Sequence, residues 1–229
     1  MNIIRAGILI VTIVCAVFIL SYYYKYKSMS NALPMPSSVV DVASLLAASP
    51  GSMEEVSVGR KDAPVTIVEY ISMTCGYCAE FHNTTFKKIE DKYIKTGKVR
   101  YILREFPLDP VAKAAIMLAR CAEQRSKGGY LGFVSMLLKR QNDWIMSDNI
   151  RDSLMNMAKF AGFSQNDFDS CVHNQRILDD INAEQKRASS MFGVYSTPSF
   201  FIGGNLYLGA MPEDVLFKII DQMLQNNKQ

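Results

Sequence analysis

Residues 73–81 read Met73-Thr74-Cys75-Gly76-Tyr77-Cys78-Ala79-Glu80-Phe81, with two cysteines three positions apart where a strand pattern meets a helical pattern. Before them, residues 65–71 are rich in β-branched and aromatic side chains, which is typical of a strand. After them, larger side chains recur near helical spacing at Phe81, Thr85, Ile89 and Tyr93. The segment therefore predicts a strand, a short turn carrying Cys75, and a helix whose first turn holds Cys78.

The position of Cys75 at a helix N-terminus predicts a reactive sulfur. Free backbone N–H groups and the positive end of the helix dipole stabilise a thiolate there, which lowers the pKa of the thiol. A thiolate is a nucleophile at neutral pH, and Cys78, one turn further on, can resolve the mixed disulfide that Cys75 forms. We expect a site of thiol–disulfide exchange.

Composition and charge exclude some other classes of protein. The 229 residues are 49% hydrophobic and 21% charged, which is typical of a globular protein. Arg5, Lys25 and Lys27 account for the net charge of +3, so the rest of the chain carries 22 basic and 22 acidic residues. A nucleic-acid groove would need a basic excess. His82 and His173 are the two histidines, and no second close cysteine pair accompanies them, so we expect neither a metal nor a cofactor.

The first 27 residues have the character of a membrane segment. Residues 6–24 carry no charge, and about 19 helical residues span roughly the hydrocarbon core of a bilayer. Tyrosines and lysines after Leu20 resemble an interfacial belt. We favour an uncleaved transmembrane anchor, because no small-x-small cleavage pattern follows Leu20 closely; a cleaved signal peptide is the alternative. Residues 28–53 are expected to form a tether, with a short helix near 39–47 capped by Ser37 or Ser38.

The third segment, residues 54–229, has an α/β pattern interrupted by helices. A short strand at 54–58 precedes the strand at 65–71, and the strand at 99–106 follows the cysteine helix, which implies a parallel pair with a crossover helix. Residues 109–192 then show only helical patterns, beginning at Asp109-Pro110. Strands at 199–202 and 206–208 form a predicted hairpin around Gly203-Gly204-Asn205, and a closing helix begins near residue 212.

Three of these features together resemble the thioredoxin fold, and specifically its DsbA-like branch. They are the strand–Cys-x-x-Cys–helix unit, the helical insertion at about 109–192, and the stretch Thr197-Pro198-Ser199-Phe200-Phe201 leading into a strand. The resemblance covers about residues 54–223. It implies a thioredoxin-like α/β fold with an all-helical insertion, preceded by one N-terminal transmembrane or signal helix.

The resemblance also implies roles for individual residues. Pro198 would follow a cis peptide bond and pack against the two sulfurs. The backbone of Thr197 would pair with an incoming peptide strand. Glu69 occupies the position of a buried acid that relays the proton of the buried sulfur, although strand alternation equally permits a surface position. Met73 and Tyr77 would form an apolar surface beside the site that grips unfolded peptide.

Two further features bear on the redox chemistry. Strong oxidases of this branch often carry Pro-His between the cysteines, whereas this chain carries Gly76-Tyr77 without a cationic imidazole. We therefore expect a less extreme pKa of Cys75 and a milder oxidant.

Cys121 and Cys171 both lie in the helical insertion, and in an oxidising compartment such a pair is more often bridged than left as two core thiols.

The resulting hypothesis is a monomeric, periplasmic dithiol oxidase, tethered to the bacterial inner membrane by its N-terminal helix. Cys75 and Cys78 would pass oxidising equivalents to folding secreted proteins that carry thiols. By resemblance, a DsbB-like membrane partner would reoxidise the pair. Two alternatives use the same residues: a disulfide reductase or isomerase, and a non-catalytic module that binds metal or unfolded peptide.

Overall fold

The computed structural model describes residues 15–23, 33–48, 51 and 53–227, which fall into two units divided after Met35. In the first unit, residues 15–23 are helical. No helix in the described ranges is long and apolar enough to cross a membrane. The anchor or signal segment expected at residues 1–27 lies mostly outside these ranges, so it stays a prediction.

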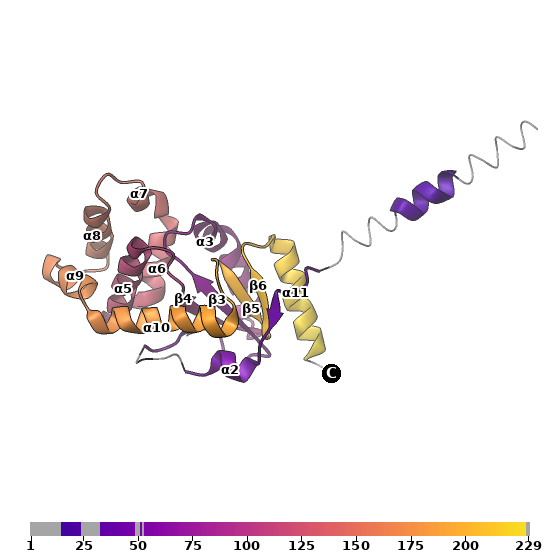
Figure 1. Cartoon of the computed structure of the whole chain (residues 1–229), viewed down its shortest axis with the longest axis horizontal. Coiled ribbons are helices and arrows are strands. Elements are labelled where there is room, and N and C mark those ends of the chain that lie inside the picture. The colour runs from indigo at the N-terminus through magenta and orange to yellow at the C-terminus, as the bar shows by residue number, and fades with distance from the viewer. Residues whose placement is uncertain (1–14, 24–32, 49–50, 52, 228–229) are drawn as a thin grey trace, which may run out of the picture. The chain divides into compact units, whose positions relative to one another are not determined.

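The second unit is built on one mixed six-stranded sheet in the order β1-β6-β5-β3-β4-β2 (Figure 1). The strands are β1 Ser38–Val39, β2 Val56–Val58, β3 Val65–Ile71, β4 Val99–Glu105, β5 Ser199–Ile202 and β6 Asn205–Leu208. The central pair, β3 and β4, is parallel over seven residues, from Val65 opposite Val99 to Ile71 opposite Glu105. The other pairs are antiparallel, and β5 and β6 form the expected hairpin.

Helices cover both faces of this sheet. The helix between β3 and β4 runs through four consecutive segments, of which η1 and η2 are π-helical: α3 Gly76–Phe81, η1 His82–Phe86, α4 Lys87–Ile89 and η2 Glu90–Ile94. It packs on one face, where Phe81 contacts Phe200 of β5 and Tyr93 contacts Phe217 of α11 (Glu213–Asn226). The opposite face of β3 presents Val68 and Tyr70 to helix α10 (Gln175–Phe192).

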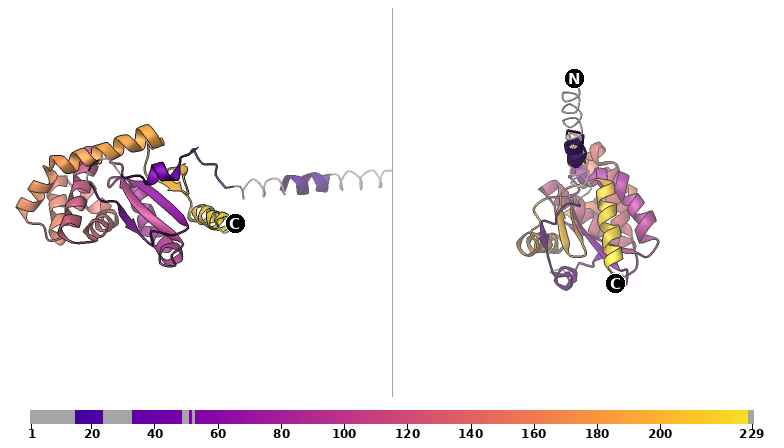
Figure 2. Two further views of the ribbon diagram at one scale, coloured as in Figure 1. Left: turned by 90° about the horizontal axis from the view of Figure 1, so that it is seen from below. Right: turned by 90° about the vertical axis from the view of Figure 1, so that its right-hand side faces the viewer.

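The helical insertion expected at 109–192 lies between β4 and β5. Its helices are α5 Pro110–Arg125, α6 Gly129–Lys139, α7 Gln141–Ile145, α8 Ile150–Phe160, α9 Gln165–Val172 and α10 Gln175–Phe192. Asp109 caps α5 by accepting from the backbone N–H of Ala112 at 2.7 Å, as the Asp-Pro start signal predicts. In Figures 1 and 2 the helices α5 to α9 gather at one end of the sheet, while α10 runs back along it.

Residues 36–47 are part of the folded unit, which corrects the expectation of a tether beginning at residue 28. β1 pairs with the edge strand β6, and Leu45 of α2 (Val42–Leu46) is 2% exposed in the core. Asp41, rather than Ser37 or Ser38, caps α2 by accepting from the backbone N–H of Ser44. A two-residue strand and a five-residue helix are too short to show a clear hydrophobic period, so sequence patterns do not separate them from a linker.

Candidate functional site

Cys75 occupies the N-cap position of α3, immediately after the turn that ends β3. Its side chain is 8% exposed, and the pKa of its thiol is lowered from 9.0 to about 6. The largest cause is a hydrogen bond from the Cys78 thiol, and the backbone N–H groups of Cys78 and Tyr77 lower the pKa further. Partial burial opposes these donors without cancelling them. Cys75 is therefore largely a thiolate at neutral pH.

Cys78 lies one turn into α3 with no exposed surface. Burial raises the pKa of its thiol well above 9.0, and the negative charges of Cys75 and Glu69 raise it further. One sulfur of the pair is thus ionised and close to the surface, while the other is protonated and enclosed. This difference favours Cys75 as the attacking sulfur and Cys78 as the resolving one.

The loop before β5 forms a second wall of the site. The Thr197–Pro198 peptide bond is cis, as the resemblance implied. In its protonated form the Cys75 Sγ donates to the Thr197 carbonyl oxygen at 3.1 Å. Two segments more than 120 residues apart in sequence therefore meet at one sulfur. The backbone of Thr197 lies where a peptide strand reaching Cys75 would find a hydrogen-bonding edge.

Glu69 points into the core beneath the cysteine helix, so a surface position is excluded. Its side chain has no exposed surface, and its Oε2 accepts from the Tyr101 hydroxyl at 2.7 Å. The same oxygen lies 2.9 Å from His82 Nε2. Oε1 is buried without a hydrogen-bond partner among the described residues. The carboxyl group is thus enclosed between Tyr101 and His82, and its charge raises the pKa of the Cys78 thiol.

Tyr77 and Met73, the two residues expected to bind a peptide, differ in their exposure to solvent. Tyr77 is 64% exposed and lines a hollow of about 350 Å³, together with Phe81, Met211 and Pro212. Met73 is completely buried, so its assignment to a peptide-binding surface was wrong. The chain has not yet left the core at Met73, because β3 ends only two residues earlier, at Ile71.

Three residues of the site are not indicated by the cysteine motif. Gln141, at the start of α7, is buried and donates through Nε2 to the carbonyl oxygens of Met73 at 2.8 Å and Cys75 at 3.0 Å. It ties the helical insertion to the cysteine turn, and no local pattern marks it. His82 and Tyr101 hold Glu69, and for both a signal exists: His82 lies four positions after Cys78 on a helix, and Tyr101 lies on the strand paired with β3.

The insertion contains the second cysteine pair as a disulfide. Cys121 of α5 and Cys171 of α9 are bridged, with Cα atoms 6.3 Å apart and 50 residues between them in sequence. This confirms the predicted pairing. The bridge holds α9 against α5 and lies apart from the Cys75–Cys78 pair, whose sulfurs are both in the reduced state here.

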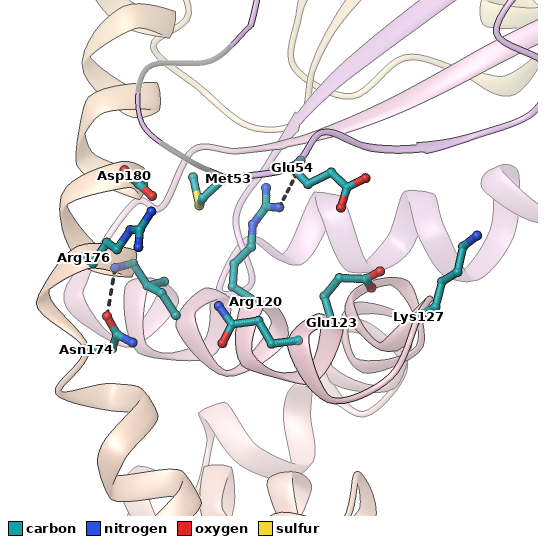
Figure 3. A pocket seen from close by; sticks show the side chains of 10 residues that line it. Met53, Glu54, Arg120, Glu123, Lys127, Asn174, Arg176 and Asp180 are labelled. Atoms are coloured by element: carbon teal, nitrogen blue, oxygen red, sulfur yellow. Dashed lines mark hydrogen bonds between the residues drawn. The ribbon is translucent and has the colours of Figure 1, made fainter.

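Metal-ligand clusters and a second hollow were the other possible functional features of the described residues. In the described part of the chain, no group of three or more His, Cys, Asp or Glu side chains is arranged to hold a metal ion. A hollow of about 840 Å³ opens between α5 and α10 (Figure 3). Its lining mixes both signs of charge, including Arg120, Glu123 and Lys127, and Arg120 donates to the Glu54 carbonyl oxygen at 2.7 Å. It contains none of the sulfur-site residues, so we assign it no part in the exchange chemistry.

Comparisons with known proteins agree with this geometry. The family model described as thioredoxin matches residues 52–222. A Rickettsia felis protein named "Putative protein-disulfide oxidoreductase" is 29% identical over 175 residues, which cover 76% of this chain and 62% of that protein. The crystal structure of Wolbachia pipientis alpha-DsbA1 superposes with a TM-score of 0.73 at 28% identity, covering 82% of this chain and 98% of the other. Oxidised BdbD from Bacillus subtilis shares the fold, with a TM-score of 0.65 at 18% identity over 78% of this chain and 98% of BdbD.

Proposed function

The chain belongs to the thioredoxin family, in its DsbA-like branch of thiol–disulfide oxidoreductases, and from that premise we propose that it is an extracytoplasmic dithiol oxidase. It would introduce disulfides into folding secreted proteins by exchange at Cys75 and Cys78. The observation that carries the proposal is the opposite displacement of the two thiol pKa values. A stable thiolate at Cys75 favours the reduced enzyme, which is the product of oxidising a client.

The reaction begins with the oxidised Cys75–Cys78 disulfide. A client thiolate attacks Cys75 Sγ, the Cys75–Cys78 bond breaks, and Cys78 leaves and takes up a proton. A second client thiolate then attacks the client sulfur of the mixed disulfide and releases the Cys75 thiolate. The client loses two electrons and gains a disulfide, and the enzyme is left as one thiolate and one thiol. A leaving sulfur with a pKa of about 6 departs readily, which favours release of the oxidised client.

The strength of this oxidant follows from the same value. A pKa of about 6 lies between about 7 for thioredoxin and about 3.5 for the strong oxidase DsbA. The donors to the Cys75 thiolate are a neutral thiol and backbone N–H groups, and Gly76-Tyr77 supplies no positive charge. This supports the expectation of an oxidant milder than the Pro-His members.

Client binding would use the edge formed by Thr197 and Pro198. A client segment lying along the Thr197 backbone would bring its sulfur to Cys75. The exposed ring of Tyr77 and the hollow of about 350 Å³ beside it would take an apolar client side chain. Met73 has no part in this surface because it is buried.

The compartment and the partners belong to the same proposal. The Cys121–Cys171 disulfide supports an oxidising location such as the bacterial periplasm. The apolar, uncharged residues 6–24 support an N-terminal membrane tether or a signal peptide. Returning the reduced pair to the disulfide needs an external oxidant, and a DsbB-like membrane protein would supply it to a monomeric enzyme.

The role of each sulfur can be tested by trapping. In a Cys15→Ser background, which removes an exposed competing thiol, full-length Cys78→Ser should accumulate a covalent Cys75–client adduct when it is incubated with an unfolded protein whose thiols have been converted to mixed disulfides with a small thiol, which is released. In the same background Cys75→Ser should trap none, because its one remaining free sulfur, that of Cys78, is enclosed. The adducts are counted on non-reducing gels and assigned by mass. Equal trapping by both variants would refute the assignment, and wild-type protein that reduces insulin but does not oxidise the client would favour the reductase alternative.

A further inference from the structure

The enclosed position of Cys78 creates a proton-transfer problem. Whenever the Cys75–Cys78 disulfide forms or breaks, Cys78 must lose or gain a proton, yet it has no exposed surface. Glu69, whose charge acts on Cys78, has none either. A proton received by Glu69 therefore needs another group to reach water.

His82 is placed to be that group. Its Nε2 lies 2.9 Å from Glu69 Oε2, and its side chain keeps 9% of its surface exposed. It also lines a groove of about 380 Å³ formed with β2, β4 and α6, together with Phe86, Leu103 and Val134. This groove shares no sulfur with the client side of the site. His82 begins the π-helical segment η1, and such turns are frequent at functional positions in helices.

We propose that His82 carries protons between Glu69 and water in this groove, so that Cys78 exchanges its proton on the side away from the client. Tyr101 also contacts Glu69 and lines the groove, but burial raises the pKa of its hydroxyl well above 10. Tyr101 therefore remains a fixed donor. An imidazole can accept a proton on one ring nitrogen while the other releases one.

The steps balance when the reduced enzyme is oxidised by oxidised glutathione. The Cys75 thiolate attacks one glutathione sulfur, forms a mixed disulfide and expels one glutathione thiolate. Cys78 gives its proton to the Glu69 carboxylate and attacks Cys75 Sγ, which expels the second glutathione thiolate. The proton on Glu69 then passes to His82, and His82 releases a proton to groove water. Two electrons move from the cysteine pair to glutathione, and oxidation of a client runs the proton path in reverse.

The groups around His82 leave it as the mobile proton carrier of this path. From β3 and β4 it faces Glu69 and Tyr101, and Glu69 in turn acts on Cys78. Along its own helix, Lys87 and Glu90 also line the groove and form an ion pair of 2.8 Å with each other. The groove residues contributed by β2 and α6 carry no titratable side chain.

The proposal is tested by the step that Cys78 performs. At saturating oxidised glutathione, the rate at which full-length reduced protein becomes oxidised reaches a plateau set by the attack of Cys78. Rapid acid quenching and mass analysis separate this step from the first, which depends on Cys75. We expect His82→Gln to lower the plateau by about tenfold or more at neutral pH, short of the ~10²–10⁴ of a group in direct contact with the reacting atoms. The pH dependence of the plateau should also change, because the variant lacks the imidazole that would carry the proton.

Two controls show whether the effect on the plateau is specific to His82. His173→Gln replaces the other histidine, which is exposed on α9's C-terminal cap, and should leave the plateau and profile unchanged. The first step serves as an internal control, because an intact site in His82→Gln keeps the normal rate of mixed-disulfide formation at Cys75. A plateau and pH profile equal to those of the wild type would overturn the proposal.

Chemical rescue separates proton transfer from packing. His82→Ala opens space beside the groove, and free imidazole should raise its plateau in proportion to the concentration of the neutral base. His173→Ala should not respond. A slow His82→Ala plateau that imidazole leaves unchanged would also overturn the proposal. The inference rests on the proposed exchange at Cys75 and Cys78. If the wild type shows no such exchange, the proposed function is refuted. If the wild type exchanges normally but His82 has no effect, only the proton relay is refuted.

Discussion

At the scale of single residues, Cys75 and Cys78 share one helical turn and hold opposite protonation states. Cys75 accepts hydrogen bonds from the Cys78 thiol and from two backbone N–H groups, whereas Cys78 is enclosed and is acted on by the charge of Glu69. Donors aimed at a sulfur stabilise its negative charge, and enclosure in apolar surroundings destabilises it. The difference in hydrogen-bond donors and burial thus makes Cys75 a nucleophile and keeps Cys78 protonated.

The pKa of Cys75 gives the first pH prediction. In reduced Cys15→Ser protein, which removes an exposed competing thiol, alkylation of Cys75 by iodoacetamide should be half-maximal near pH 6. Cys78→Ala in the same background removes the strongest donor, so the midpoint should move to higher pH. Mass mapping of the alkylated peptide against pH gives both midpoints. A wild-type midpoint close to 9.0, the ordinary value, would contradict the site described here.

The lowered pKa of Cys75 also makes the stability of the folded reduced protein depend on pH. The folded-state pKa of Cys75 lies below its unfolded value, so ionisation stabilises the folded reduced protein above the unfolded value of about 9.0. That contribution is lost as the pH falls from about 9 through about 6. The disulfide form lacks this ionisation, so its stability does not change for this reason.

Residue-level motifs explain what sequence could and could not predict at the site. Cys75, Cys78 and Pro198 follow from fixed spacings and from the Thr-Pro loop, which need no knowledge of tertiary packing. The burial of Glu69 could not be decided, because a strand presents residue 69 to either face with equal ease. Met73 was misplaced because its apolar character suits a binding surface and a core equally well.

At the scale of elements, the helical insertion does more than extend the fold. α7 begins with Gln141, whose amide joins the carbonyl groups on both sides of the turn that carries Cys75. The Cys75 carbonyl also accepts from the backbone N–H of Ala79, in the first turn of α3, at 3.2 Å. The insertion therefore adds a side-chain donor from outside the thioredoxin-like core to the cysteine turn.

Replacing this amide should loosen the turn. We expect Gln141→Ala to lower the free energy of unfolding by about 1–3 kcal/mol, because the Met73 carbonyl loses this buried donor and the Cys75 carbonyl keeps only the Ala79 N–H. Gln165→Ala, on an exposed helix of the same insertion, is the matched control and should change it by less than about 0.5 kcal/mol. Urea unfolding of the oxidised proteins measures both. Equal effects of the two substitutions would show that Gln141 does not support the turn.

Long elements could be predicted from sequence because their signals repeat. The helices of the insertion show several apolar turns each, and Asp109-Pro110 marks a start. The crossover helix was predicted to its correct length, but its two π-helical segments were not, since a shift of one residue leaves the apolar period almost unchanged. For β1 and α2 the sequence predicts only a tether with a short helix, because these elements contain two and five residues and show no clear hydrophobic period.

At the scale of the whole molecule, the domain begins earlier than its cysteine motif suggests. Arg187 of α10 donates to the carbonyl oxygens of Ser44, Leu45 and Ala47, at 2.9, 3.3 and 3.1 Å. A guanidinium at the C-terminal end of α2 satisfies carbonyl groups that the helix itself leaves open. The N-terminal arm, residues 36–47, is thereby fastened to the helix that leads into the Thr197-Pro198 loop.

Leu45 tests whether this arm contributes to the core. Leu45→Ala should lower the free energy of unfolding by about 2–5 kcal/mol, since its side chain is 2% exposed and its loss leaves a cavity. Val42→Ala in the same helix, at 38% exposure, should cost far less. Thermal or urea unfolding of the full-length variants compares the two. A negligible effect at Leu45 would mean that the arm acts as a tether after all.

The ionised Cys75, the enclosed Cys78 and the fold that holds them together determine the reduction potential of one redox couple. That potential decides in which direction electrons flow between the protein and its client. This reduction potential, obtained by equilibrating the full-length protein in glutathione buffers and counting alkylated thiols by mass, is the most direct test of the proposed oxidase. We predict a value between about −270 mV for thioredoxin and about −120 mV for DsbA. A value at or below about −270 mV would make the protein a reductase and contradict the proposal, and one near −120 mV would contradict the mild character assigned to Gly76-Tyr77.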